Sequence, residues 1–240
     1  MAGHSHWSKI KRAKGANDAK RGKIWSKIAR KIIIAAKAGG GDPFQNLSLR
    51  YTIDEAKAVN MPKDTIANAI KKGTGELGAN DYESVTYEGY APGGVALMIE
   101  ALTNNRSRTA PDLRALFDRH GGNLATTGSV SFQFGKFGII TIKSESTDEE
   151  SLMELALEAG AEDVRNQGEV FEVITPPTAM HKIKDVIAAK HIAIEATDVT
   201  YLPSNTVAVD AEKAAGLLKF IDALEDNDDV QSVSHNAELP

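Results

Sequence analysis

The chain has 240 residues, of which 42% are hydrophobic and 25% are charged, the balance of a globular protein with room for two or three domains. It contains no cysteine, which excludes disulfides, thiolate catalysis and cysteine-ligated zinc. No apolar run approaches the roughly 20 residues of a membrane-spanning helix, so we expect a cytoplasmic protein without a membrane partner.

The net charge of -5 hides a strong asymmetry along the chain. Residues 1–72 hold 16 lysines and arginines against 5 acidic residues, whereas residues 73–240 hold 12 against 28. Binding of a polyanion depends on local charge more than on net charge. The first third of the chain is therefore the candidate nucleic-acid-binding surface.

Residues 1–16 combine basic side chains with little apolar content, which predicts a flexible cationic arm that orders on its partner. Trp7 could stack on a base or ribose, or it could anchor the arm to the next domain; the sequence leaves both open. If Met1 is removed, the terminal amine, two amides and the imidazole of His4 could wrap copper(II) or nickel(II), as in any chain that starts this way. We predict no metal centre and no cofactor.

Residues 17–78 are predicted to form a three-helix nucleic-acid-binding domain. The first helix should run from residue 17 or 18 to about residue 38, where three glycines and Asp42-Pro43 end it, with shorter helices at 46–60 and 62–73. At about 100° per residue, the apolar side chains of the first helix fall on one side and its basic side chains on the other. The arm and this helix supply the candidate phosphate ligands, which are Lys9, Lys11, Arg12, Lys14, Lys20, Arg21, Lys23, Lys27, Arg30 and Lys31.

The segment Gly73-Thr74-Gly75-Glu76-Leu77-Gly78 has the spacing of a dinucleotide-binding loop. Such a loop follows a strand and opens a helix, whereas this one follows a predicted helix and precedes an extended segment. We interpret it as a linker and expect no small-molecule substrate.

The remaining residues are predicted to form two α+β domains. Residues 136–200 show the order β-α-β-β-α-β, which is ferredoxin-like. Residues 79–135 and 201–240 would be the two halves of a second such domain, with strands at 95–102, 129–134, 206–209 and 230–233 and helices at 110–120 and 211–224. The predicted fold is thus a multidomain α+β protein, with a three-helix domain followed by two ferredoxin-like domains, one inserted in the other.

A second candidate phosphate site lies before the helix predicted at 110–120. Asn104, Arg106 and Arg108 precede its start, where arginines and free N–H groups can bind an anion. A capped connection with glycine turns explains the segment equally well. The acidic residues between 225 and 229 lack the spacing of a calcium loop, and the histidines are isolated, so we expect a solvated turn and no enzymatic activity.

Several blocks of the sequence resemble the YebC/PmpR family. They are Met1-Ala2-Gly3-His4-Ser5, Asp18-Ala19-Lys20-Arg21-Gly22-Lys23, Ala36-Lys37-Ala38-Gly39-Gly40-Gly41-Asp42-Pro43, Tyr87-Glu88-Gly89-Tyr90 with Pro92-Gly93-Gly94, and Gly121-Gly122-Asn123-Leu124 with Gly128-Ser129-Val130. His6, Trp25 and Ala91 depart from the family pattern. The resemblance implies three domains and a probable transcriptional regulator that binds DNA. Related proteins are also implicated in translation, including mitochondrial translational activation and the relief of ribosomes at proline-rich stretches.

Three functions remain open because a basic arm and helix bind any phosphate backbone. The chain could be a DNA-binding regulator of gene expression or a ribosome-associated translation factor that binds ribosomal RNA. It could also be an adaptor whose acidic domains dock a protein. Since no helix carries a clear set of base-reading side chains, we expect weak sequence specificity.

Overall fold

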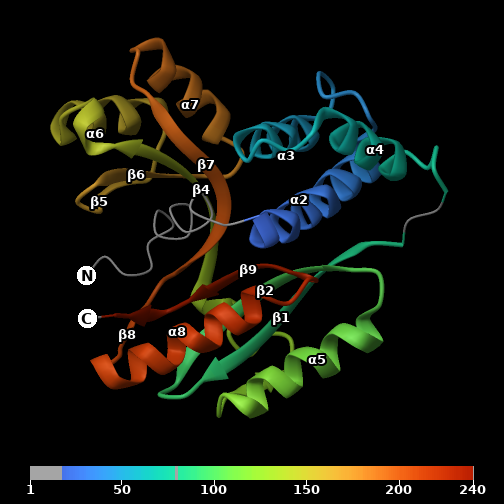
Figure 1. Cartoon of the computed structure of the whole chain (residues 1–240). Coiled ribbons are helices and arrows are strands. Elements are labelled where there is room, and N and C mark those ends of the chain that lie inside the picture. Colours follow the sequence, from blue (N-terminus) through green and yellow to red (C-terminus); the bar gives the residue numbers. More distant parts are fainter. Residues whose placement is uncertain (1–17, 79–80, 240) are drawn as a thin grey trace.

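The computed structural model describes residues 18–78 and 81–239 (Figure 1). A helical domain comes first, followed by two α+β domains with antiparallel four-stranded sheets, one inserted in the other. This arrangement confirms the predicted fold class. Within the described ranges, no helix combines the length and the apolar character needed to cross a membrane.

The apolar faces of the helical domain meet in one core, which includes the buried side chains of Ile32, Leu49 and Ile66. The apolar stripe of the first helix packs against the two shorter helices, as its periodicity predicts. The helices of this domain are α2 (Asp18–Gly39), α3 (Leu47–Ala58) and α4 (Lys63–Gly73).

Asn46 determines where α2 ends and α3 begins. Its side-chain oxygen accepts the N–H of Leu49 at 3.0 Å, which caps α3, and its side-chain nitrogen donates to the carbonyls of Ala35 and Gly40. A Cβ on Gly39 would lie 2.7 Å from this amide, so the close approach requires glycine. The glycine run therefore ends α2 through a specific contact with Asn46.

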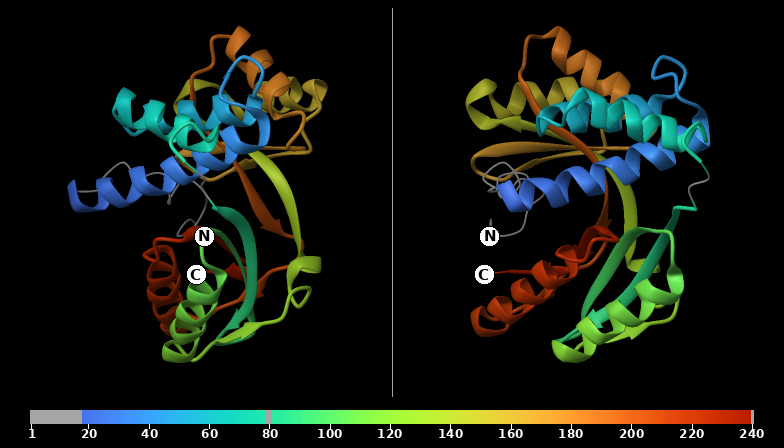
Figure 2. Two further views of the ribbon diagram at one scale, coloured as in Figure 1. Left: turned by 90° about the vertical axis from the view of Figure 1, so that its right-hand side faces the viewer. Right: turned by 45° about the vertical axis from the view of Figure 1, so that its right-hand side comes forward.

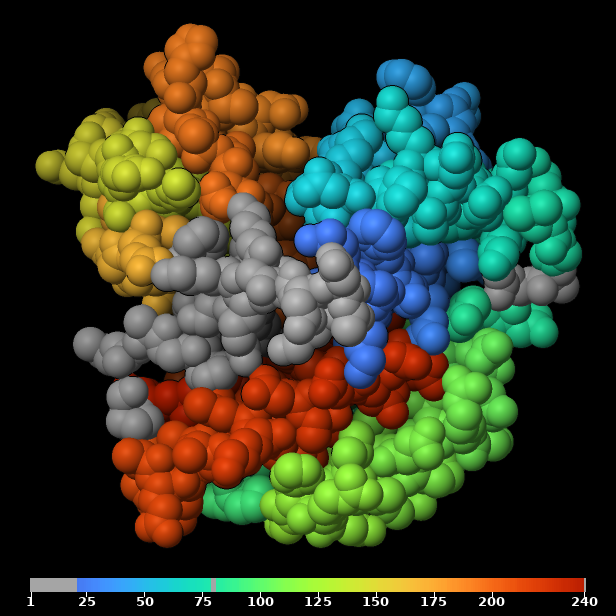
Figure 3. All heavy atoms as spheres, in the orientation of Figure 1, coloured from blue at the N-terminus to red at the C-terminus, as the bar shows by residue number. Residues whose placement is uncertain are grey.

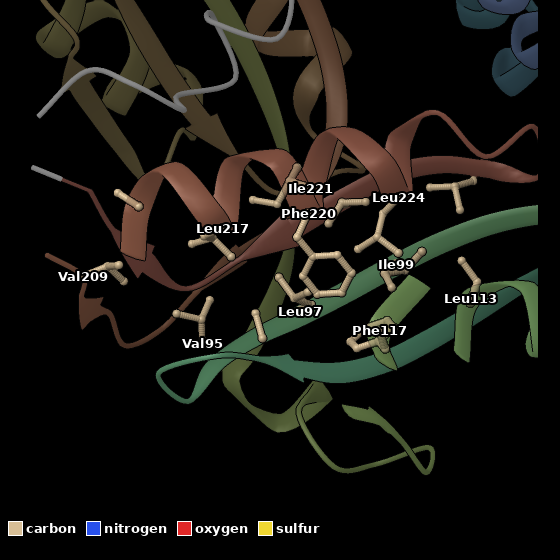
Figure 4. Close-up of a cluster of buried hydrophobic side chains, with 14 residues drawn as sticks. Val95, Leu97, Ile99, Leu113, Phe117, Val209, Leu217, Phe220, Ile221 and Leu224 are labelled. Carbon is tan, nitrogen blue, oxygen red and sulfur yellow. The ribbon is translucent and has the colours of Figure 1, made fainter. Parts of the chain in front are cut away.

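The split α+β domain has the strand order β3-β1-β2-β9, with two helices packed on one face of the sheet. Figure 4 shows this core, in which the rings of Phe117 and Phe220 meet edge to face with their centroids 4.9 Å apart. The elements are β1 (Glu83–Ala91), β2 (Val95–Thr103), α5 (Arg106–Arg119), β3 (Asn123–Ala125), α8 (Ala211–Glu225) and β9 (Val230–His235).

Two of the strands expected in the split domain differ in the structure, and β1 was not predicted as a strand. The residues predicted as a strand at 129–134 form the 3-10 helix η1 (Ser131–Gln133) before the next strand begins. The strand predicted at 206–209 is the short β8 (Val207–Ala208), which pairs with β10 (Ala237–Glu238) outside the main sheet. The place in the main sheet that was expected for the strand at 206–209 is occupied by β1, which the sequence suggested only as an extended segment. A buried glutamate in β1 interrupts the apolar alternation that identifies a strand.

The inserted domain has the strand order β5-β6-β4-β7, which is that of a ferredoxin-like sheet. Its helices pack together on one face of this sheet. The elements are β4 (Phe134–Lys143), η2 (Ser144–Ser146), α6 (Glu149–Ala159), β5 (Asp163–Asn166), β6 (Val170–Thr175), α7 (Met180–Ala189) and β7 (Ile194–Pro203).

Strands β4 and β7 are long and connect the two α+β domains (Figures 1 and 2). Because β4 and β7 are antiparallel, the start of β4 and the end of β7 lie at the same end of the ladder. There, Phe134 of β4 and Tyr201 of β7 pack with Ala96 and Met98 of β2. These strands are continuous through the domain boundaries expected near residues 135 and 200. The two sheets are thus joined by paired strands that pack on the second face of the split domain's sheet.

Glu88 explains why two separate sequence blocks meet in the split domain. Its buried carboxylate accepts the backbone N–H groups of Gly128, Val130 and Ser131 at 2.8, 2.7 and 2.9 Å. Burial opposes ionisation, but these three hydrogen bonds outweigh it and lower the pKa of Glu88. The block around Glu88 therefore holds the turn that precedes β4.

Gly89 provides a test of this packing. A Cβ here would lie 2.4 Å from the ring of Phe117 and 2.7 Å from the carbonyl oxygen of Asn123. We expect Gly89→Ala to lower the free energy of unfolding by about 1–3 kcal/mol, the usual cost of overpacking, as measured by urea denaturation. Gly216→Ala is the control, because nothing lies within 4 Å of its added Cβ in α8. Equal stability of the two variants would contradict the packing described.

Candidate nucleic-acid interface

The basic face of α2 lies against the acidic turn. We define this turn as residues 225–229, from the last residue of α8 to the residue before β9. Figure 3 shows α2, in blue, directly beside the orange and red C-terminal segment. Lys23 Nζ lies 3.4 Å from the carboxylate of Asp226 at the exposed edge of this contact. The expectation of a solvated turn holds for Asp226 and Asp228, which are exposed, but is wrong for Asp229, which is buried. The basic helix supplies opposite charges to this turn from about 200 residues away in the chain.

Lys27 donates from its ammonium group to the main-chain carbonyl of Glu225, the last residue of α8. Helix ends leave such carbonyls without intrahelical partners, and the helix dipole makes them favourable for a cation. Burial nevertheless lowers the pKa of Lys27 to about 8, against the attraction of Glu225, Asp226 and Asp228. The contact thus contains a charged group whose desolvation costs free energy near neutral pH.

Asp229 is the centre of the contact between α2 and the acidic turn. Its side chain is 6% exposed and accepts from Thr109 Oγ1 at 2.7 Å, Arg108 at 2.8 Å, Arg30 at 3.2 Å and Thr103 Oγ1 at 3.3 Å. Burial opposes ionisation, but the hydrogen bonds from Arg108 and Thr109 and the nearby guanidinium charges outweigh it and lower the pKa of Asp229. One carboxylate therefore joins α2, α5 and the end of β2.

Lys31 links α2 to α3 through an ion pair with Glu55, at 2.9 Å. Burial alone would lower the pKa of Lys31, but the attraction of Glu55, followed by Asp198 and Glu100, outweighs it and raises the pKa. Of the basic residues predicted on α2, the structure therefore brings Lys23, Lys27, Arg30 and Lys31 together with acidic groups of the same chain.

The other candidate ligands fall into two groups. Arg21 is exposed near the start of α2, and Lys20 lies in α2 with its side chain outside the described part. Lys9, Lys11, Arg12 and Lys14, the stacking candidate Trp7 and the metal candidate His4 lie outside the described residues.

The second candidate phosphate site is built differently from expected. Helix α5 begins at Arg106, a turn earlier than residue 110, because Asn105 caps it by accepting the N–H of Arg108 at 3.1 Å. Arg106 forms a bidentate ion pair with Glu83, with both distances 2.6 Å. Arg108 contacts Asn104 at 3.4 Å in addition to the acidic turn. Both arginines are about half exposed, so each pairs with a carboxylate while remaining open to solvent.

The phosphate ligands predicted from the sequence did not include the exposed lysines and arginine of the helical domain beyond the first 31 residues. We call them the outer basic surface; they accompany the exposed acidic residues Asp42, Asp54, Asp64 and Glu76. Their charge was visible in the sequence, but only the burial of α3 and α4 shows which faces remain exposed. The outer basic surface consists of Lys37, Arg50, Lys57, Lys63, Lys71 and Lys72.

The outer basic surface lies on the far side of α2 from the acidic turn. Helices α3 and α4 pack on one side of α2 and α8 lies on the other, as both views in Figure 2 show.

Across residues 18–78 and 81–239, no group of three or more histidine, aspartate or glutamate side chains is arranged to hold a metal ion.

Comparison with known proteins gives matches along almost the whole chain. The family model for the TACO1/YebC N-terminal domain matches residues 5–76, and that for the TACO1/YebC second and third domains matches residues 82–237. A probable transcriptional regulatory protein of Desulforapulum autotrophicum is 49% identical over 240 residues, which cover 100% of this chain and 97% of the relative. A protein of the same name from Treponema pallidum is 50% identical over 240 residues, with 100% and 98% covered.

A solved structure has the same fold. The crystal structure of a conserved hypothetical protein from Aquifex aeolicus superposes with a TM-score of 0.89 at 45% sequence identity. The match covers 98% of each chain, so the arrangement of all three domains is shared.

Lys27 makes the contact between α2 and the acidic turn sensitive to pH. An unfolded lysine titrates near 10.5, whereas burial lowers the pKa of folded Lys27 to about 8. Between these values the unfolded chain binds more protons at this site, so the cost of the buried charge, complete below about pH 8, disappears as the pH rises. Raising the pH from about 7 to about 9.5 should therefore stabilise the parent relative to Lys27→Met by about 1 kcal/mol, with solvent screening allowed for, in urea denaturation.

Lys219→Met is the control for this measurement, because Lys219 is exposed on α8 and takes no part in the interface. Its stability difference from the parent should not follow the same pH dependence. A constant difference between the parent and Lys27→Met across this pH range would contradict the role given to Lys27.

Proposed function

Because the chain belongs to the TACO1/YebC family, whose relatives are named probable transcriptional regulatory proteins, we propose that it is a non-enzymatic, nucleic-acid-binding regulator of gene expression. The observation that carries this proposal is the separation of charge between the basic first third and the acidic remainder. A cationic surface concentrates a polyanion by long-range attraction.

The outer basic surface and the N-terminal arm are the proposed contacts with phosphate groups. Lys23 and Arg30 of α2 already contact the acidic turn, but the outer basic surface faces away from this turn. The acidic domains would repel a nucleic acid from the other side, so binding at the outer surface is electrostatically oriented. Five of the six outer cations are lysines, which contribute affinity without reading bases.

Structured RNA, such as ribosomal RNA, is the second candidate target. Helix α2, 22 residues long, is packed against α3 and α4 and against the acidic turn. A helix covered in this way does not enter a DNA major groove without disrupting the contacts around Asp229. This geometry favours recognition of backbone shape over recognition of an operator sequence.

The first test reverses charge on the outer basic surface. The variant Lys63→Glu/Lys71→Glu/Lys72→Glu should lose at least about tenfold in affinity for nucleic acid and show a shallower dependence on salt, because each lost phosphate contact removes about 0.9 from the slope. Fluorescence anisotropy across a salt series measures both quantities. Lys23, Lys27 and Arg30 are unsuitable for this test, since a glutamate there would face the acidic turn and disturb the fold.

Lys182→Glu/Lys190→Glu/Lys219→Glu is a matched control, because it makes the same change in net charge at exposed lysines of the α+β domains. It should bind as the parent does. Equal loss in both variants would show only a net-charge effect. Binding that does not respond to salt would contradict phosphate recognition and support the protein-adaptor function.

The second test separates operator recognition from backbone recognition. We expect the affinities for random DNA duplexes and for any proposed target promoter to differ by far less than the roughly thousandfold preference that marks site-specific proteins. A preference of that size at physiological salt would establish an operator-reading regulator. Sedimentation with ribosomes, compared with recovery on chromosomal DNA from the same lysate, would identify the class of nucleic acid.

A further inference from the structure

Phe44 is the most exposed large hydrophobic residue of the described chain, with 93% of its surface accessible. It lies in the loop between α2 and α3, which projects from the upper edge of the helical domain (Figures 1 and 2). Burying a phenylalanine ring is among the larger single contributions to folding stability, so its exposure forgoes that gain.

The loop that carries Phe44 is held by a network of hydrogen bonds. The carboxylate of Asp42 accepts the N–H of Phe44 at 2.9 Å, and the carbonyl of Asp42 accepts the N–H of Asn46 at 2.9 Å. Asn46 in turn donates to the carbonyls of Ala35 and Gly40 at 2.7 and 2.8 Å. The backbone under the ring is therefore fixed, and the ring points outward from an ordered loop.

The loop packs on the end of α4 as well as on α2. A Cβ on Gly41 would lie 2.9 Å from Thr74 and 3.1 Å from Ile70. A Cβ on Gly73 would lie 2.5 Å from the carbonyl oxygen of Ile33. The last turns of α2 and α4 are thus in close contact beside the loop.

These last turns carry exposed lysines, namely Lys37 on α2 and Lys71 and Lys72 on α4. Cations are favourable there because the helix dipoles place negative charge at both helix ends. Two exposed acidic residues lie in the same region and keep their negative charge: the carboxylate of Asp42 accepts the Phe44 N–H, and that of Glu76 accepts the hydroxyl of Thr74 at 2.9 Å. The three lysines outnumber them, so the region keeps a positive balance. The loop that exposes Phe44 therefore lies beside two helix ends that carry basic side chains.

We propose that Phe44 is a stacking platform for an unpaired base of RNA, with Lys37, Lys71 and Lys72 contacting the flanking phosphates. This inference rests on the proposed nucleic-acid-binding function and specifies the ligand as single-stranded or looped RNA. A phenylalanine ring stacks on any base but makes no hydrogen bond to it, so such a site binds without sequence selectivity.

The surroundings of the ring favour a nucleic acid over a protein. A specific protein interface buries about 800 Å² on each partner around an apolar core from which charge is depleted. Here the helix ends beside the loop carry lysines, and the other exposed apolar side chains of the described helical domain, Leu47 and Leu77, are only about half exposed. An exposed ring on a loop next to basic helix ends matches the combination of stacking and phosphate contacts in single-strand binding sites.

The test compares single-stranded RNA with duplex RNA on the full chain. Binding of a labelled oligouridine of about 12 nucleotides, within the usual range of single-strand site sizes, is measured by fluorescence anisotropy beside a fully paired RNA duplex. Phe44→Ala should weaken binding of the single strand about 5- to 150-fold, the loss expected for one stacked base, and leave duplex binding unchanged. Phe44→Trp should retain the affinity and show quenching on binding beyond that of the parent's own tryptophans.

Phe132→Ala is the matched control, because Phe132 is also an exposed phenylalanine, 76% accessible, but lies on η1 in another domain. It should bind both RNAs as the parent does. Unchanged single-strand binding by Phe44→Ala would overturn the stacking site and leave the salt-dependent binding function standing, with the ring then available to a protein partner. Equal losses on single strand and duplex would also overturn it. If the parent binds neither RNA nor DNA, the proposed function and the stacking site both fail.

Discussion

The contact between α2 and the acidic turn is the interaction on which the arrangement of the domains depends. Asp229 receives hydrogen bonds from Arg30 of the helical domain and from Arg108, Thr103 and Thr109 of the split domain. A buried carboxylate without such partners would cost more free energy than a surface ion pair contributes, so the donors from both domains act together on Asp229. Helix α2 and the start of β9 are therefore positioned together by one side chain.

This contact changes the meaning of the charge asymmetry. Basic residues in the first third attract acidic residues of the same chain, and the structure shows this internal attraction at Lys23, Lys27 and Arg30. The outer basic surface lies on the other side of α2 from the acidic turn; its side chains are exposed, and Lys57 pairs with the neighbouring Asp54 at 3.3 Å. A single basic segment thus stabilises the domain arrangement on one side, and in the proposed function its other side binds phosphate.

Three of the described blocks that resemble the family, at 36–43, 87–94 and 121–130, have structural roles in this chain. Glu88 holds the turn at Gly128, and Gly89 lies where a side chain would collide with Phe117. Asn46 joins the end of α2 to the start of α3 through Gly40. Such contacts determine backbone geometry, so these blocks identify the fold, whereas the charged and aromatic surface residues carry the proposed function.

The sequence by itself determined the helices of the first domain, the ferredoxin-like order of residues 136–200 and the separation of charge. Those features depend on caps, glycine breaks and hydrophobic periodicity, which act over a few residues. Only the tertiary structure decided that β1 enters the split domain's sheet, because its buried Glu88 is satisfied by N–H groups 40 residues later. It also decided that Arg30 meets Asp229, 199 residues along the chain, since side chains so far apart become neighbours only after the domains have packed.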